Sequence, residues 1–225
     1  MKFTDLLPKA LAFAVALALA ILVAAAAPAP APAQGTGAPA AAPAFGKSIV
    51  IVFSLTGKTR SIAEVIAAKT GSDLYVIETA SPYPSAEGEI IALEEARRAA
   101  GSAPELKGTP PDLGPYSFVF LGSPVWFGGV PDHVSLFLKE FDFGGRGVAL
   151  FATAGSRPGD IIKNLGEAVN GGKVLSPGLV NRRDDDWDKE ALERIVEEYL
   201  AMLKLDEYFA ALDGNPVTAE GQQRN

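Results

Sequence analysis

The chain contains no cysteine, and this absence excludes several kinds of site at once. Without thiols the protein can form neither a disulfide nor a cysteine-ligated metal centre, and it cannot be a lipid-modified lipoprotein. An excess of positive charge is also missing. The formal net charge of −7 makes nucleic acid and anionic membrane surfaces unsuitable partners, because both would repel an acidic protein. No metal site is expected.

The N-terminal segment lacks the features of a folded core and has those of a secretory signal peptide at 1–33. Lys2 and Lys9 precede an uncharged, alanine-rich stretch at 10–27, and small residues then occur at the spacing that a signal peptidase recognises. We therefore expect cleavage after Ala33 and a periplasmic or secreted protein. The alternative is an uncleaved membrane anchor, and only then would a membrane be a partner. Alanine disfavours this alternative, because its burial yields little transfer free energy.

No twin arginine precedes the apolar stretch, so we expect export of an unfolded chain that acquires any cofactor afterwards. Residues 34–46 are mostly Ala, Pro and Gly. They are expected to form a linker, since this composition cannot bury enough surface to fold. The folded domain is expected at 47–205, followed by a C-terminal tail at 206–225.

Unbroken apolar runs alternate with helical patterns through the folded domain. Such runs are typical of strands covered on both faces, as in parallel sheets. They lie at 49–53, 74–77, 118–121, 148–152 and, more weakly, 173–175. Helical spacing of apolar residues occurs at 62–66, 134–141 and 192–203, and a more polar helix is expected at 87–100. This order predicts a doubly wound α/β domain: a five-stranded parallel sheet with helices on both faces and ligands beyond the carboxyl ends of the strands.

The segment SLTGKT at 54–59 follows the first expected strand and opens a helix, as a phosphate-binding loop does. It lacks the first glycine of a triphosphate-binding loop, because Val52 occupies that position inside the strand. Its hydroxyls, its glycine and the free amides of a helix start would instead suit one terminal phosphate. The alternative interpretation is an ordinary strand-to-helix turn with threonine as the cap.

Two more loops follow the expected strands at 118–121 and 148–152. GSPVWFGGVP sets Trp126 and Phe127 among glycines and prolines, which predicts a surface loop whose aromatic rings can contact a flat partner. Alternatively, Trp126 folds back as a lid on the core. TAGSRPGD, at 153–160, is small, polar and rich in glycine. Together the three loops predict a mononucleotide site for a flat heterocycle.

These loops resemble those of the flavodoxin-like family. The phosphate loop of that family, S/T-x-T-G-x-T, is matched in full by Ser54, Thr56, Gly57 and Thr59. The loop at 122–131 is similar to the G-x-P-x-W-x-G-x-x-P of one FMN-binding flavodoxin subgroup. That subgroup also carries PYP, present here at 82–84, and a segment similar to FLKEFDFGG at 137–145. The resemblance covers about 47–203.

The resemblance implies a flavodoxin-like fold that binds FMN without a covalent link. The residues implied to bind it are Ser54, Leu55, Thr56, Gly57, Lys58, Thr59, Pro124, Val125, Trp126, Phe127, Gly128, Thr153, Ala154, Gly155 and Ser156. The first loop would hold the phosphate, Trp126 would stack on the isoalloxazine ring, and the third loop would face its pyrimidine edge. Gly128 or Gly129 would belong to the peptide that flips beside the reduced ring. No side-chain acid or base is required, so no catalytic residue is implied.

The implied function is electron transfer by an exported FMN redox protein, whose partner is a redox protein or a small acceptor such as a quinone. One alternative is an FMN-dependent NAD(P)H oxidoreductase of the quinone-reductase type, and another is a flavin-free binding module on the same scaffold. Whether the protein is an enzyme stays open. His133, the only histidine, is expected as a surface residue rather than a proton donor, and Arg157 as a solvated surface residue.

Overall fold

The computed structural model describes residues 46–155 and 157–212 of the 225-residue chain. The expected signal peptide and nearly all of the expected linker therefore lie outside the described residues. Within the described part, no helix is both long enough and apolar enough to cross a membrane.

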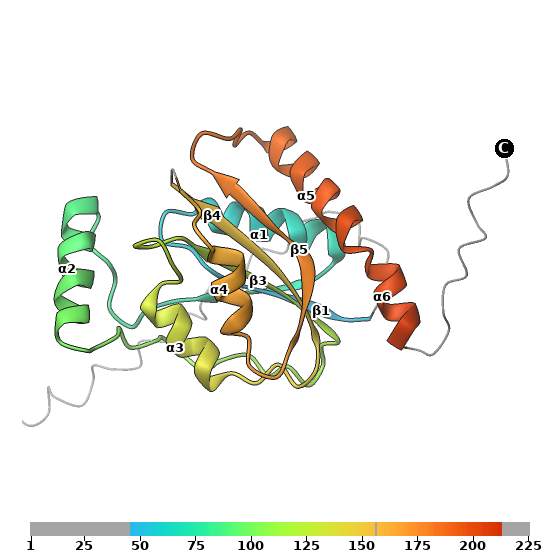
Figure 1. Ribbon diagram of the computed structural model, residues 1–225, viewed down its shortest axis with the longest axis horizontal. Coiled ribbons are helices and arrows are strands. Elements are labelled where there is room, and N and C mark those ends of the chain that lie inside the picture. The colour runs from blue at the N-terminus through green and yellow to red at the C-terminus, as the bar shows by residue number, and fades with distance from the viewer. Residues whose placement is uncertain (1–45, 156, 213–225) are drawn as a thin grey trace, which may run out of the picture. The chain divides into compact units, whose positions relative to one another are not determined.

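Five parallel strands form one sheet in the described part of the chain (Figure 1). They are β1 Ser48–Phe53, β2 Asp73–Ile77, β3 Phe118–Pro124, β4 Gly147–Ala154 and β5 Lys173–Arg182. Their order across the sheet is β2-β1-β3-β4-β5. The chain therefore adds β2 on one side of β1 and then returns to add β3 on the other side, so the connections after β1 and β3 diverge. In open parallel sheets, a reversal of this kind marks the place where ligands bind.

The helices lie on both faces of the sheet (Figure 1). They are α1 Lys58–Thr70, α2 Glu87–Ala99, α3 Asp132–Glu140, α4 Ile161–Glu167, α5 Lys189–Leu203 and α6 Leu205–Leu212. Buried side chains of α1 and α5 pack in one apolar cluster on one face, and those of α3 and α4 pack in a second cluster on the other. The predicted doubly wound fold, with a five-stranded parallel sheet and helices on both faces, is confirmed.

Strand β1 shows why its sequence is an unbroken apolar run. Ile49 and Ile51 point into the cluster under α3 and α4, whereas Val50 and Val52 point into the cluster under α1 and α5. All four side chains are buried because both faces of the strand are covered. Each contributes roughly 1.5–3 kcal/mol of transfer free energy.

Two segments extend beyond what the apolar pattern indicated. Strand β5 continues past the expected run to Arg182, through a register shift against β4 between Ala149 and Phe151. Helix α6 begins at the expected end of the domain and continues into the segment expected as a tail. Its Phe209 ring lies 5.6 Å from that of Phe118, so α6 packs on the core.

We predict that Gly122→Ala destabilises the fold. Gly122 pairs with Phe151 on the neighbouring strand, and a Cβ at this glycine would lie 2.1 Å from the buried Phe151 ring. The ring or the strand must then shift, at a cost of about 1–3 kcal/mol of unfolding free energy. Urea unfolding measures the loss.

The matched control is Gly88→Ala in α2, where an added Cβ meets no atom within 4 Å. This change should be neutral or stabilise the protein by up to about 1 kcal/mol, because alanine favours helix. Equal stabilities for Gly122→Ala and the parent protein would contradict the close packing of β3 on β4.

Candidate functional site

Three loops meet at the carboxyl edge of the sheet, because β1, β3 and β4 are parallel neighbours. They are the predicted phosphate loop at 54–57, the aromatic loop at 125–131 and the third loop that starts at Gly155. A backbone hydrogen bond of 2.8 Å from the amide of Val125 to the carbonyl of Thr153 joins the second and third. The three loops that the sequence predicted to form a site are thus adjacent in the fold.

The start of α1 presents backbone donors without a side-chain acceptor. Gly57 is the N-cap at φ 87°, no side chain caps the helix, and the first turn has no acidic residue. The first intrahelical bond at this end runs from the amide of Ser61 to the carbonyl of Gly57, at 2.8 Å. The preceding amides and the helix dipole attract an anion. The alternative of a threonine cap is wrong.

Space and hydroxyl groups surround this helix start. A Cβ on Gly57 would meet no atom within 4 Å, so the loop is open above the glycine. Thr56 is exposed, and Ser54 and Leu55 are half-buried beside it. A cavity of about 450 Å³ borders Ser54 and Leu55 and extends along the end of β2 to Tyr83. An anionic group therefore has room and donors at this place.

Thr59 and Lys58 face away from this open side. The hydroxyl of Thr59 is buried and lies 2.8 Å from that of Thr153, which ties the start of α1 to the end of β4. The ammonium of Lys58 lies 4.0 Å from the centre of the Trp187 ring, a cation–π contact. The indole N–H of Trp187 donates to the carbonyl of Arg182, at 2.9 Å.

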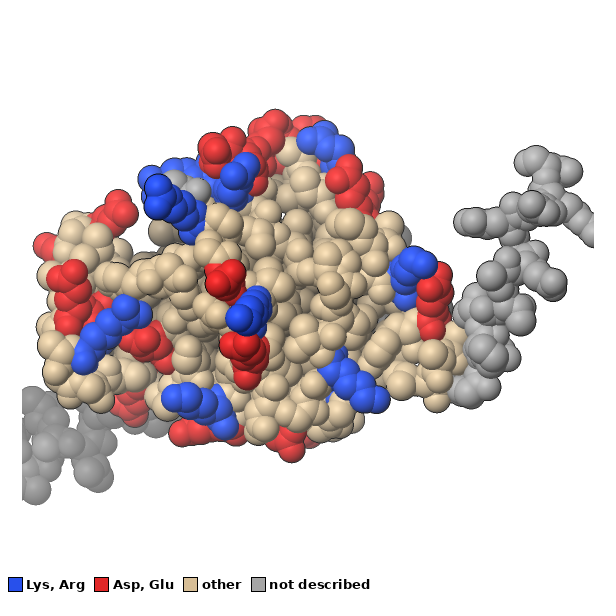
Figure 2. Space-filling view, viewed as in Figure 1, with Lys and Arg blue, Asp and Glu red and all other residues tan. Residues whose placement is uncertain are grey.

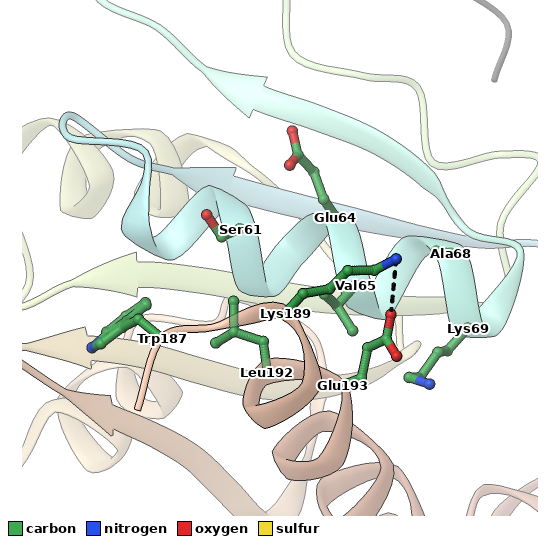
Figure 3. A pocket seen from close by; sticks show the side chains of 9 residues that line it. All are labelled: Ser61, Glu64, Val65, Ala68, Lys69, Trp187, Lys189, Leu192 and Glu193. Atoms are coloured by element: carbon green, nitrogen blue, oxygen red, sulfur yellow. Dashed lines mark ion pairs between the residues drawn. The ribbon is translucent and has the colours of Figure 1, made fainter. Parts of the chain in front are cut away.

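Trp187 also closes one end of a groove of about 570 Å³ between α1 and α5 (Figure 3). Val65 and Leu192 form the apolar part of its lining, and the ion pair between Lys189 and Glu193, at 3.7 Å, lies on its rim. This groove could not be predicted from the sequence, because its two walls, α1 and α5, are far apart along the chain.

The aromatic loop forms a tight turn at 126–129. The amide of Trp126 donates to the carbonyl of Gly129 at 3.0 Å, and the amide of Gly129 donates back at 2.9 Å. Both central residues have positive φ, 49° at Phe127 and 78° at Gly128. This is a type I′ pattern, and it costs about 1–2 kcal/mol at phenylalanine because Cβ crowds the carbonyl.

Arg98 of α2 holds the strained phenylalanine. Its guanidinium carbon lies 4.3 Å from the centre of the Phe127 ring, and the same group forms an ion pair of 2.8 Å with Asp132. The ring is 48% exposed. An exposed aromatic ring in a strained turn is available to a ligand or partner.

The indole of Trp126 is half-buried and meets three other rings edge-on. Its centre lies 5.5 Å from Phe53, 5.3 Å from Tyr83 and 5.5 Å from His133. Phe53 is the last residue of β1, so this cluster sits at the point where the sheet order reverses. Trp126 therefore packs on the edge of the core and is still accessible from outside.

The third loop supplies a short, partly buried wall. Thr153 and Ala154 end β4 and are buried, and Gly155 is half-buried. Pro124 pairs with Thr153 across the sheet. Ser156, which the sequence also placed at the site, lies outside the described residues.

Arg157 is exposed, as predicted. Figure 2 shows Lys and Arg side chains near the end of β4 and the loop into α5, next to acidic ones. Arg182, the last residue of β5, and Arg183, which begins that loop, are exposed as well.

The prediction that His133 is a surface residue is wrong, because the side chain is completely buried. It lies on the face of α3 that packs on the sheet, four residues before the buried Phe137. Its ring centre is 4.1 Å from that of Phe53. The i, i+4 spacing to Phe137 was the signal that sequence reasoning missed.

Four polar side chains, of which Glu94 and His133 are buried and Tyr83 and Arg97 are half-buried, form a network behind Trp126. The hydroxyl of Tyr83 donates to a carboxylate oxygen of Glu94 at 2.9 Å, and Arg97 donates to the same oxygen at 2.7 Å. The Tyr83 oxygen also lies 3.4 Å from Nδ1 of His133. Glu94 is 1% exposed, although α2 is otherwise a surface helix. Sequence reasoning used Tyr83 only within the PYP motif, and it assigned no role to the charged residues of α2.

Burial sets the protonation of this network. Burial lowers the pKa of His133 to about 4, whereas the negative charge of Glu94 acts to raise it. Burial, followed by the hydrogen bond to Glu94, raises the pKa of Tyr83. The imidazole is therefore neutral at neutral pH, and its Nε2 has no hydrogen-bond partner among the described residues.

Asn181 is a second buried polar residue that sequence reasoning missed. It pairs with Thr153 in the sheet, so both side chains project from the same face, the one that carries Thr59. The side chain is buried, and its Nδ2 has no partner within the described part of the chain. A donor is thus left under the start of α1. No group of three or more acidic or histidine side chains in the described residues could hold a metal ion.

Comparisons with known proteins agree with this arrangement. The family model for flavodoxin matches residues 47–198. A candidate flavoprotein from Bacteroides eggerthii DSM 20697 is similar in structure, with a TM-score of 0.56, 26% identity, and coverage of 70% of this chain and 98% of that one. No curated protein matches.

Two further solved structures show the same fold at lower identity. A candidate flavoprotein from Bacteroides uniformis ATCC 8492 has a TM-score of 0.55 and 24% identity, and covers 68% of this chain and 98% of its own. A flavoprotein from Lactobacillus acidophilus NCFM, solved in complex with FMN, has a TM-score of 0.52 and 21% identity. The match covers 62% of this chain and 94% of that one.

The buried histidine should make stability depend on pH. The unfolded chain binds a proton at His133 near its ordinary pKa of 6.5, whereas the folded chain does so only near 4. As pH falls through this window, the unfolded state gains protons that the folded state cannot bind. The protein should lose unfolding free energy at up to about 1.4 kcal/mol per pH unit from this group.

Urea unfolding between pH 7 and pH 4.5 measures the slope for the parent protein and for His133→Phe, which keeps an aromatic ring and cannot titrate. The parent should lose stability more steeply than the variant. Parallel pH profiles would show that His133 titrates normally in the folded protein.

Proposed function

Because the chain belongs to the flavodoxin family, we propose that its domain binds FMN without a covalent link and transfers electrons through it. One observation carries this proposal. An uncapped, acid-free helix start and a half-buried indole lie on adjacent loops at the point where the sheet order reverses. A terminal phosphate suits the first, and a flat ring suits the second. The FMN complex of a protein with this fold lends further support.

The phosphate contacts would come from the start of α1. The amides after Gly57 and the hydroxyls of Ser54 and Thr56 are the donors. Thr59 would act by fixing the helix start through its bond to Thr153. Lys58 would add a positive charge after it leaves the ring of Trp187, a contact that is worth about 0.5–1 kcal/mol at an exposed site.

The ring contacts would come from the other two loops. Trp126 would stack on the ring, Val125, Phe127 and Gly128 would line its edge, and the backbone from Thr153 onward would face its pyrimidine side. The strained turn at 126–129 would place Gly128 or Gly129 where a peptide can flip at little cost.

When bound, FMN supplies one- and two-electron chemistry. This chain would hold the phosphate, orient the ring and exclude water from one of its faces with Trp126. No described side chain is assigned as a catalytic acid or base. The electrons would pass to a redox partner protein or to a small acceptor such as a quinone.

We further propose that the protein works outside the cytoplasm. The observation is the alanine-rich stretch at 10–27, followed by small residues up to Ala33. N-terminal sequencing of the protein recovered from its native compartment should give Gln34 as the first residue. An intact Met1 in a membrane fraction would contradict this proposal.

The phosphate assignment predicts that Gly57→Asp loses FMN. The substitution fills the open space above the helix start and puts a negative charge beside the phosphate. We expect the dissociation constant for FMN to rise at least tenfold, which corresponds to about 1.4 kcal/mol. The absorbance and fluorescence of FMN, titrated into the purified protein, report binding.

The matched control is Gly145→Asp, which also adds a carboxylate at a glycine of positive φ, 78°, where a Cβ meets no atom within 4 Å. It lies just before β4, at the amino ends of the strands, and should bind FMN as the parent does. If Gly57→Asp binds as tightly as this control, the phosphate does not sit at the start of α1. If the parent itself binds no FMN, the proposed function is wrong.

A further inference from the structure

The Nε2 atom of His133 is a buried polar atom without a partner among the described residues. Leaving such an atom unpaired costs about 1–3 kcal/mol, so a stable protein rarely keeps one without a use for it. The atom belongs to a ring that contacts Phe53 at 4.1 Å and Trp126 at 5.5 Å. It is therefore buried at the same edge of the sheet as the proposed ring site.

The surrounding hydrogen bonds determine what kind of partner this atom requires. Tyr83 has one hydroxyl proton and lies near two acceptors, Glu94 at 2.9 Å and Nδ1 of His133 at 3.4 Å. The proton belongs to Glu94, because that contact is shorter and its acceptor is a carboxylate oxygen that also pairs with Arg97. The phenolic oxygen is then free to accept, so Nδ1 must carry the proton of the imidazole.

A neutral imidazole with its proton on Nδ1 has only a lone pair on Nε2. The ring is neutral because burial lowers its pKa to about 4. The atom can therefore accept a hydrogen bond and cannot donate one. Its missing partner is an N–H or O–H group.

Trp126 covers one side of the histidine ring. Trp126 is half-buried and touches the histidine edge-on, and it begins the strained turn at 126–129. A flat ligand that stacks on the indole would displace its contacts with Phe53 and Tyr83. The same movement would open the side of the histidine ring that now faces Trp126.

We propose that Nε2 of His133 accepts a hydrogen bond from a ring N–H of the bound flavin and thereby favours its reduced form. This inference rests on the proposed function. Two-electron reduction of FMN with uptake of a proton adds an N–H to the ring, so the reduced cofactor offers a donor that the oxidised cofactor lacks. An acceptor that is otherwise unpaired and buried stabilises the form with the extra donor. Tyr83 acts as a positioning residue, because it fixes the proton of the imidazole on Nδ1.

Potentiometry of the FMN-loaded protein tests the proposal, together with dissociation constants for FMN measured in air and under dithionite. His133→Phe should leave the dissociation constant of oxidised FMN within about threefold of the parent and raise that of reduced FMN about tenfold. A tenfold change lowers the midpoint potential by about 30 mV for a two-electron couple. His133→Gln, which keeps an acceptor oxygen, should lower the potential less.

A second variant separates the hydrogen bond from the packing of the ring. Tyr83→Phe keeps the aromatic ring and removes the oxygen that holds the proton on Nδ1, so it should lower the potential in the same direction. Its matched control is Tyr116→Phe. The Tyr116 hydroxyl donates to Asp73 at 2.7 Å, next to the amino ends of the strands, and its loss should leave the potential unchanged.

Each outcome decides the matter. If both variants weaken the binding of oxidised and reduced FMN equally, the two side chains have a structural role and the proposal is wrong. The proposal is also wrong if both variants keep the midpoint potential of the parent, because Nε2 then meets only water. Should His133→Phe fail to fold, Tyr83→Phe decides by the same criteria. Absence of FMN binding to the parent protein would instead overturn the proposed function, and this inference with it.

Discussion

The site depends on one constraint, the parallel arrangement of a sheet that is buried on both faces. Parallel strands all end at the same edge, so loops that are distant along the chain become neighbours there. Because β1 is flanked by β2 and β3, the loops after β1 and β3 must also turn toward opposite faces. The hydroxyl contact between Thr59 and Thr153 then fixes the start of α1 against β4. Topology therefore places the three loops side by side, and on the proposed function their own residues would determine that a phosphate and a flat ring bind there.

Several buried polar groups gather at this same edge, although Ser48 and Thr70 are buried near the opposite one. Glu94, His133, Thr153 and Asn181 are all buried, and two of them keep an atom without a partner in the described residues. Groups of this kind reduce stability unless they are satisfied, so their concentration next to the loops marks where selection for something other than stability has acted. The strained backbone of Phe127 lies at the same place. The buried polar groups and the strained backbone thus lie at the same edge of the sheet, although they belong to separate segments of the chain.

The fold could be predicted because its signals are local. Apolar runs such as 49–53, and the helical spacing of apolar residues in α5, can be recognised within windows of about ten to fifteen residues. The three loops of the site could be recognised as well, since glycine, proline and hydroxyl residues follow β1, β3 and β4. The failure at His133 had two causes. The local i, i+4 spacing to Phe137 was overlooked, and the contacts that bury the ring come from Phe53 and Tyr83, which are far away in the sequence. The contact between Lys58 and Trp187 could not be foreseen for the same reason.

The packing of Trp126 also bears on how an exported flavoprotein could fold. If the chain is exported unfolded and binds FMN, as we propose, it would have to reach a stable state before it meets the cofactor. The indole covers Phe53, Tyr83 and His133 and shields their apolar surface from water. This contact stabilises the fold and, on the proposed function, would compete with a bound flavin, so it would lower the affinity for the flavin by the free energy needed to displace the indole. On this proposal, two opposing demands would fall on Trp126. Its side chain would have to stabilise the fold before the cofactor binds, and it would have to give up the same contacts if the cofactor is to bind very tightly.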